Sequence, residues 1–329
     1  MTTFWFTVIA FLWTGYFVLE GFDFGVGMLA PLLSRSEAER GQVLGTIGPV
    51  WDGNEVWLVT AVGAMFAAFP AWYSGLLSGF YLPLFLVIAG LVVRGVGLEW
   101  RGKVASPRER ALCDAAVAAG SALPAVLWGA IFGAALYGTP AAAALGGALS
   151  LTVTLVHGGV FVALKTEGPV RERARRAALA ASAASIPVAA LALPAVPGHH
   201  GPSWAWGTAL LAMAALAGGA ALIGRRREGW AFAATSAAIA AATATLFGAL
   251  ASAPLPGLTL AEAASAPYTL RVLTWIGVVA LPGVLLYQAW TYWVFRRRLT
   301  APARPAPADA RPVFAEGRPG GAAGTRPAG

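Results

Sequence analysis

Acidic side chains at helical spacing are the residues of this chain with the clearest capacity for chemistry. Glu20 and Asp23 follow Tyr16 at intervals of four and three residues, so a helix would place all three on one face. Further along the chain, Asp52 and Glu55 are also three residues apart and would be neighbours on a second helix. Carboxyl groups shielded from water can take up and release protons near neutral pH. The spacing therefore points to proton chemistry, provided that both segments are helices in an apolar environment.

The composition shows that the environment is apolar. Of 329 residues, 58% are hydrophobic and 12% are charged, whereas soluble domains carry about 25% charged residues. This excludes an ordinary soluble enzyme, and a single cysteine excludes a disulfide scaffold. The chain is predicted to be an all-α polytopic membrane protein.

Nine segments are long and apolar enough to cross a bilayer, which takes roughly 20 helical residues. They show no alternation with a period of two, so helices are favoured over a barrel. The predicted spans lie near residues 4–33, 46–70, 73–98, 111–137, 140–164, 175–196, 203–224, 230–252 and 271–295. The remainder, residues 299–329, is rich in Ala, Pro and Gly and is predicted to be a disordered cytoplasmic tail.

The basic residues set the orientation of these spans. All but two of the 23 lysines and arginines fall in alternate loops or in the tail, and such loops are cytoplasmic. With nine spans, the N-terminus is predicted outside and the C-terminus in the cytoplasm. The net charge of +8 is thus a topology signal, and nucleic acid is not needed to explain it.

Ionisable side chains within the spans each need a reason, because burying one in a bilayer costs at least ~2.5 kcal/mol. They fall in the first four spans and are Glu20, Asp23, Asp52, Glu55, Arg94, Glu99 and Asp114. Asp52 lies near the inner end of the second span, so with Asp23 it can form a series of carboxylates entering the membrane from the cytoplasm. One interpretation is a proton path, and the other is that the acids pair with Arg94 and fix helix register.

The structural interpretation is favoured for Glu55, Glu99 and Asp114, which lie near helix ends, Arg94 or loop cations. Arg94 is most simply a counter-ion for one of the acids or an anchor near the cytoplasmic interface. Metal and haem sites need several His, Cys, Met or carboxylate ligands. With three histidines, of which only His157 lies in a span, the chain is predicted to hold no haem by itself. The role of His157 stays open.

Two motifs resemble subunit II of bd-type quinol oxidases: GFDFGVG at residues 21–27 and GPVWDGNEVWL at residues 48–58. The similarity continues through Arg94 and the segments 274–275 and 287–290, and it extends almost to residue 298. The resemblance implies a heterodimer in the bacterial inner membrane, a quinol:oxygen oxidoreductase of the translocase class in which this chain is not catalytic alone. It also implies a nine-helix fold of two four-helix bundles plus one peripheral helix.

In this family, a related subunit I carries two b-type haems and one d-type haem, oxidises quinol and reduces oxygen to water. Subunit II is its haem-free partner and contributes to a cytoplasmic proton path that builds a proton motive force without pumping. The resemblance places the entry acid at Asp52 and deeper acids at Asp23 and Glu20. Supporting positions are Trp51, Asn54, Glu55, Arg94, Glu99 and Asp114. Some members hold a structural quinone, and a small single-helix accessory subunit is a further expected partner.

Two other functions remain open on the sequence alone. The chain could be a purely structural partner of the oxidase, or a secondary transporter whose acids bind a coupling cation, although no matched pair of interrupted spans favours a transporter. The type of quinol, and whether the partner holds a d-type haem or only b-type haems, are properties of other chains.

Overall fold

The computed structural model describes residues 1–199 and 201–300, and within these residues the regular secondary structure is helical throughout. The prediction of an all-α chain is thus confirmed. The twelve helices of this part of the chain are α1 (Thr2–Leu33), α2 (Glu37–Leu44), α3 (Trp51–Ala68), α4 (Pro70–Gly79), α5 (Tyr81–Arg101), α6 (Pro107–Tyr137), α7 (Pro140–Lys165), α8 (Gly168–His199), α9 (Trp204–Gly224), α10 (Glu228–Leu250), α11 (Leu260–Ala263) and α12 (Pro267–Val294).

Capping residues explain where several helices begin. At α6, the Ser106 side chain accepts a hydrogen bond from the backbone of Glu109 while the Glu109 side chain bonds back, which satisfies two free backbone donors at once. At α7, the Thr139 side chain accepts a hydrogen bond from the backbone N–H of Ala142, and Pro140 occupies the first turn, where a missing N–H costs nothing. Ser36 caps the short helix α2. The starting points of these three helices are therefore fixed by their local sequence.

The predicted second and third spans differ from the structure. Residues 46–70 contain α3, but α3 and α4 meet at an angle of 119° across Phe69. Pro70 begins α4, and proline disfavours a helical conformation in the residue before it. The predicted span at 73–98 therefore starts inside α4, whereas the continuous apolar helix is α5 (Tyr81–Arg101).

Within the described residues, eight helices are long and apolar enough to cross a membrane, and α3 with α4 makes a ninth candidate if the bent pair is one span. The eight are α1, α5, α6, α7, α8, α9, α10 and α12. The predicted spans overlap all of them, although α8 starts earlier than the predicted 175–196 segment.

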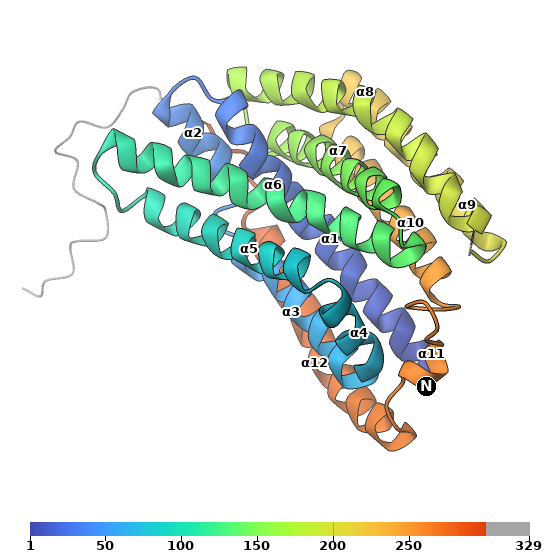
Figure 1. Cartoon of the computed structure of the whole chain (residues 1–329). Coiled ribbons are helices and arrows are strands. Elements are labelled where there is room, and N and C mark those ends of the chain that lie inside the picture. The colour runs from blue at the N-terminus through green and yellow to red at the C-terminus, as the bar shows by residue number, and fades with distance from the viewer. Residues whose placement is uncertain (200, 301–329) are drawn as a thin grey trace, which may run out of the picture.

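Helix α1 lies in the middle of the molecule, in contact with α3, α6, α7 and α10 (Figure 1). Its C-terminal half packs in an apolar cluster with α2 and α7 to α10. Its N-terminal half packs in a second cluster with α3 to α6, α11 and α12. Helix α12 lies at one edge beside α3, and of its residues only Leu270 and Gln288 are buried. The two clusters thus share α1, while α12 is peripheral.

The small residues of the 21–27 motif bring α1 and α7 into backbone contact. A side chain on Gly25 would place its Cβ 2.2 Å from the carbonyl oxygen of Thr154 and 2.7 Å from the Cα of Gly158. Such contact is typical of small residues at membrane helix interfaces, and it fixes α1 against the second half of the molecule.

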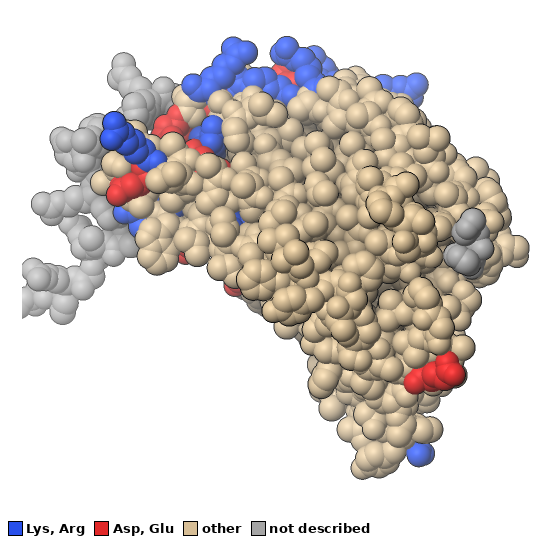
Figure 2. Space-filling model, viewed as in Figure 1, with Lys and Arg blue, Asp and Glu red and all other residues tan. Residues whose placement is uncertain are grey.

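Charged side chains gather at one end of the molecule, where α8 begins and the loop before α6 lies, and the rest of the visible surface is almost uncharged (Figure 2). At this end, Arg173 on α8 forms an ion pair with Glu39 on α2 at 2.7 Å, and the hydrogen bonding of Arg173 lowers the pKa of Glu39. The segment after α12 also packs at this end, because the backbone N–H of Leu299 donates to the carbonyl oxygen of Lys165 at 2.7 Å. Most of the predicted tail, residues 301–329, lies outside the described residues.

Candidate functional site

The charged side chains of α1 and α5 that the sequence singles out meet inside the protein. Glu20 and Asp23 on α1 and Arg94 on α5 are all completely buried. Nη1 of Arg94 donates to Oε2 of Glu20 at 2.6 Å, and Nη2 lies 3.7 Å from Oδ2 of Asp23. The guanidinium therefore serves both acids of α1.

Helix α3 connects this pair of acids to the surface. Oε1 of Glu55 lies 3.4 Å from Nη1 of Arg94, and 26% of the Glu55 side chain is exposed. Asp52, one turn earlier on α3, is exposed. The carboxyl groups thus run from the exposed Asp52, through the partly buried Glu55, to the buried acids of α1.

The cluster lies below the charged end of the molecule. Arg94 is seven residues from the end of α5 and Asp23 is ten residues from the end of α1, which corresponds to about 10 Å and 15 Å along the helices. Since α3 begins at Trp51, its first turn already lies at the level of the cluster. The acids are therefore inside the apolar part of the protein, although near one of its ends.

Three carboxyl groups share one guanidinium in this cluster. Glu20, Asp23 and Glu55 lie within 4 Å of Arg94, and Oδ1 of Asp23 has no hydrogen-bond partner among the described residues. Each uncompensated charge in a protein interior costs several kcal/mol. Pairing alone would require only one acid for one cation. An excess of buried carboxyl groups is an arrangement that can take up protons, because each bound proton removes one negative charge.

Asn54 links the cluster to the peripheral helix α12. Its Nδ2 donates to Oδ2 of Asp23 at 2.7 Å. Its Oδ1 accepts two hydrogen bonds, from Nε2 of Gln288 and from the hydroxyl of Tyr292, both at 2.9 Å. Asn54 is completely buried and Gln288 nearly so. Asp23 is thus hydrogen-bonded, through one amide, to a helix more than 230 residues away in the sequence.

Sequence reasoning named Asn54 but missed Gln288 and Tyr292. The signal was present, because Gln288 is a polar residue within an apolar segment of the last span. A search restricted to ionisable groups passes over it, since glutamine carries no charge. Polar uncharged side chains inside spans form hydrogen bonds between helices, so they belong in the same search.

Aromatic rings and a close helix contact hold Arg94 in place. Its guanidinium lies 5.0 Å from the ring centre of Phe24 and 6.0 Å from that of Trp51, within the range of cation–π attraction. On the other side of α5, a Cβ on Gly120 would lie 2.6 Å from the carbonyl oxygen of Gly90 and 2.7 Å from the backbone nitrogen of Arg94. Only glycine permits α6 to approach the backbone of Arg94 so closely.

The family model for "Cytochrome bd terminal oxidase subunit II" matches residues 1–295 of this chain. The chain belongs to this family. It is therefore a membrane protein and a subunit of a bd-type oxidase, as the resemblance of the two motifs predicted.

Similar proteins cover most of the chain. The cytochrome bd ubiquinol oxidase subunit 2 of Bacillus subtilis is 36% identical over 90% of this chain and 96% of its own length. The cytochrome bd-I ubiquinol oxidase subunit 2 of Escherichia coli K12 is 30% identical over 90% of this chain and 94% of its own. A chain in the structure of the bd oxidase from Geobacillus thermodenitrificans has the same fold, with a TM-score of 0.68, 12% identity, and coverage of 89% of this chain and 98% of that chain.

Two of the acids in this subunit II chain lie apart from the buried cluster. Asp114 on α6 is bound by Arg101 at 2.6 Å and by Arg40 at 2.8 Å. Glu99 on α5 is half exposed and lies 3.3 Å from Lys103. Both contact the loop cations that the sequence analysis considered for them, and neither lies near Asp23.

Tyr16 and His157 each form hydrogen bonds away from the acids. The Tyr16 hydroxyl accepts a hydrogen bond from Nε1 of Trp128 on α6 at 2.9 Å. His157 on α7 is completely buried, with Nδ1 2.7 Å from the Thr235 hydroxyl and Nε2 3.1 Å from the carbonyl oxygen of Val18. His157 therefore joins α7 to α10 and α1. Among the described residues, no group of three His, Cys, Asp or Glu is placed to hold a metal ion.

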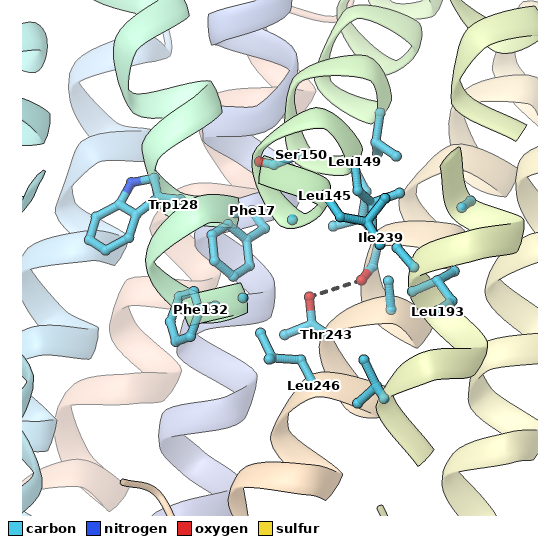
Figure 3. Close-up of a pocket in the computed structure, with 18 of the residues that line it drawn as sticks. Phe17, Trp128, Phe132, Leu145, Leu149, Ser150, Leu193, Ile239, Thr243 and Leu246 are labelled. Atoms are coloured by element: carbon cyan, nitrogen blue, oxygen red, sulfur yellow. Dashed lines mark hydrogen bonds between the residues drawn. The ribbon is translucent and has the colours of Figure 1, made fainter. Parts of the chain in front are cut away.

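A large apolar cavity borders α1, whose Tyr16, Phe17 and Phe24 contribute to its wall. It has a volume of about 550 Å³ and lies between α1, α6, α7, α8, α9 and α10. Figure 3 shows Phe17, Trp128 and Phe132 at one side, Leu193 and Ile239 at the other, and Leu246 below them. The hydroxyl of Thr243 is turned to its own helix, donating to the carbonyl oxygen of Ile239 at 2.9 Å. The cavity therefore offers an almost entirely hydrocarbon surface.

Proposed function

We propose that this chain is the haem-free subunit II of a bd-type terminal quinol oxidase, and that its acid cluster conducts protons from the cytoplasm toward a haem-bearing subunit I. In this complex, quinol is oxidised and oxygen is reduced to water. Family membership and the printed names of the relatives, ubiquinol oxidase subunits, support the oxidase assignment. The excess of carboxyl groups over cations in the buried cluster is the observation that carries the proton path.

In the proposed path, Asp52 is the entry acid, and Asp23 and Glu20 are the inner relay. Glu55, for which the sequence favoured a structural role, lies between them and within 3.4 Å of Arg94. Arg94 holds the carboxyl groups together and limits their net charge, so that a proton can be bound without the cluster becoming strongly positive or negative. Trp51 and Asn54 are supporting residues.

The charge distribution supports a cytoplasmic origin for the protons. Basic side chains gather at the end of the molecule where α8 begins (Figure 2), and positive ends face the cytoplasm. In this orientation, the N-terminus of α1 is outside, the segment after α12 is cytoplasmic, and the protein spans the bacterial inner membrane. We count the bent α3–α4 pair as the second of nine spans, in two four-helix bundles with α12 peripheral.

The haem-bearing partner is proposed to cover the face formed by α5 and α12. Both helices expose rows of large apolar side chains, and Glu55 on α3, which contacts Arg94 of α5, is partly exposed. A carboxyl group facing lipid would be costly, whereas a protein partner can supply polar contacts. The exposed residues include Tyr81, Phe85, Ile88, Val92 and Val96 on α5 and Trp275, Val279, Leu286, Tyr287 and Trp290 on α12.

The expected cofactors divide between the two chains. Two b-type haems and one d-type haem are proposed for subunit I, where they carry out the electron transfer and oxygen chemistry. For a structural quinone, the cavity fits the hydrocarbon part, because its volume of about 550 Å³ lies within the roughly 300–1,000 Å³ of ligand pockets. Phe17, Phe132 and Leu246 would contact that part. A small single-helix accessory subunit is a further proposed partner.

The proposed path would make oxygen reduction take up its protons from one side of the membrane. Reduction of one oxygen molecule to water consumes four protons. If these protons enter at Asp52 from the cytoplasm while quinol releases its own protons outside, charge is separated across the membrane without a pump. The residues of this chain contribute by binding and passing protons, and not by contacting the reacting oxygen.

The test uses the purified oxidase complex in proteoliposomes with the Asp52→Asn variant. Removing a positioned proton-transfer group lowers rates by about 10²–10⁴-fold where no other route exists, so quinol-driven oxygen consumption and proton uptake should fall at least tenfold while haem content is unchanged. Glu99→Gln is the matched control, because Glu99 is an acid near the same end but outside the cluster. Normal turnover in Asp52→Asn would reject the path.

The same experiment separates the alternatives. A purely structural partner predicts normal proton uptake in every Asp52→Asn complex that retains its haems, with the Glu20–Arg94 ion pair fixing helix register. A secondary transporter predicts that the chain purifies without a haem-bearing chain. Co-purification of haem therefore removes the transporter, and the variant then distinguishes the remaining two.

A further inference from the structure

The hydrogen-bond chain from Asp23 to α12 contains two side-chain amides, and it has a property that an ion pair lacks. Asn54 donates to Asp23 through Nδ2 and accepts from Gln288 and Tyr292 through Oδ1. A carboxylate accepts hydrogen bonds only, whereas a protonated carboxyl group must also donate one. Asn54 faces Oδ2 of Asp23, so when the proton is carried by this oxygen, the group opposite has to be a donor in the ionised state and an acceptor in the protonated state.

An amide can satisfy both requirements by turning over. Its oxygen and its NH₂ group are similar in size, so rotation exchanges acceptor and donor without repacking the helices. With Asp23 ionised, Nδ2 of Asn54 faces the carboxylate at 2.7 Å, as observed. With Asp23 protonated, the Asp23 hydroxyl would donate to the Asn54 oxygen. The Asn54 NH₂ group would then donate to the oxygen of Gln288 or of Tyr292.

Gln288 is itself an amide, and the hydroxyl of Tyr292 can donate or accept. Both partners of Asn54 can therefore follow its rotation, so that the oxygen and the NH₂ group of Asn54 have hydrogen-bond partners in both states. An unsatisfied buried donor or acceptor would cost about 1–3 kcal/mol. Replacing either partner with an apolar residue removes one of the two hydrogen bonds that hold Asn54 on the α12 side.

We propose that Gln288 and Tyr292 are positioning residues, which hold the Asn54 amide against Asp23 in both the ionised and the protonated state of that carboxyl group. The proposal rests on the proton path proposed above and extends it to α12. The proton bound by Asp23 comes from cytoplasmic water, and no other reactant is needed. The charged and titratable groups that face Asp23 in this arrangement are Glu20 of α1, Glu55 of α3, Arg94 of α5 and Tyr292 of α12.

The test compares Gln288→Met and Tyr292→Phe in the whole oxidase complex. Methionine has nearly the shape of glutamine without its hydrogen bonds, and Tyr292→Phe removes one hydroxyl. Tyr73→Phe is the matched control, because it removes a hydroxyl from a half-buried tyrosine of α4, outside the acid cluster and outside the face proposed for the partner. Haem content, thermal stability, and the pH dependence of quinol-driven oxygen consumption are measured for each complex, with Asp23→Asn as the reference for loss of the relay.

We expect Gln288→Met to lower turnover roughly tenfold and Tyr292→Phe about threefold, the range of one buried hydrogen bond. Both should alter the pH profile at unchanged haem content, and Tyr73→Phe should match the wild type. Unchanged turnover and pH profiles in both α12 variants, with Asp23→Asn slow, would overturn this inference alone. Loss of haem together with an unchanged pH profile in the remaining complex would show a merely structural role and also overturn it. Normal turnover of Asp23→Asn would instead contradict the proton path itself.

Discussion

Two neighbouring surfaces of α1 face different environments. Glu20 and Asp23 face α3, α5 and α12, where hydrogen bonds and ion pairs converge on Arg94 and Asn54. Phe17 and Gly21 line a cavity of about 550 Å³ with an almost wholly apolar wall. A single helix thus borders both a site suited to charge and a site suited to hydrocarbon.

This contrast shows how a membrane protein can bury charged side chains without a large loss of stability. Buried charge is tolerated where counter-charge and hydrogen bonds converge from several helices, and the cluster draws on four. The cavity needs no such convergence, since apolar surface in a membrane protein requires no partner. Single substitutions in the acid cluster should therefore change stability and turnover strongly, whereas substitutions in the cavity lining should change them weakly.

The largest effect is expected for Arg94→Leu. This change leaves three carboxyl groups in a buried space without their cation, and breaking a buried ion pair from one side costs about 3–5 kcal/mol. The subunit should assemble poorly, which the yield of haem-containing complex and its thermal unfolding temperature would show. Arg94→Lys retains the charge and should recover part of the yield. Wild-type stability of Arg94→Leu would mean that the cluster does not need its cation.

A moderate effect is expected from filling the cavity with Ala242→Phe. Ala242 on α10 lines the cavity, and extra volume in packed regions costs about 1–3 kcal/mol, whereas open space accepts it. We expect nearly normal stability and turnover, with less quinone extracted per purified complex. A matched substitution outside the cavity, Ala214→Phe on the exposed face of α9, should leave the quinone content unchanged. Equal quinone content in Ala242→Phe and wild type would contradict a quinone tail in the cavity.

The smallest effect concerns the ion pair that joins α2 to α8 at the charged end. Because hydrogen bonding to Arg173 lowers the pKa of Glu39, the ionised carboxylate stabilises the folded state. This contribution is present above the ordinary glutamate pKa of about 4.3 and is lost as the pH falls through the lower pKa of the folded protein. Glu39→Gln should therefore be slightly less stable than wild type at pH 7, and the difference should vanish in acid. A difference independent of pH would exclude the ion pair as its source.

The sequence was a good guide to elements whose signal is local. Hydropathy located helices at α1, α6, α7, α9, α10 and α12 within a few residues, because a span must be apolar over its whole length. It was a poor guide to the α3–α4 bend, since Pro70 and Phe69 lie within one apolar stretch. A proline permits a bend there, but the neighbouring helices determine its angle.

For the acid site, the sequence by itself determined the inventory: which acids lie in spans, which helix faces carry Glu20 and Asp23, and the one arginine available to them. Helical geometry makes these faces a local property. The tertiary structure alone decided that Arg94 serves three carboxyl groups and that Gln288 reaches Asn54 from the far end of the chain. Spacing along one helix says nothing of which helix lies opposite, because that depends on how all the spans pack together.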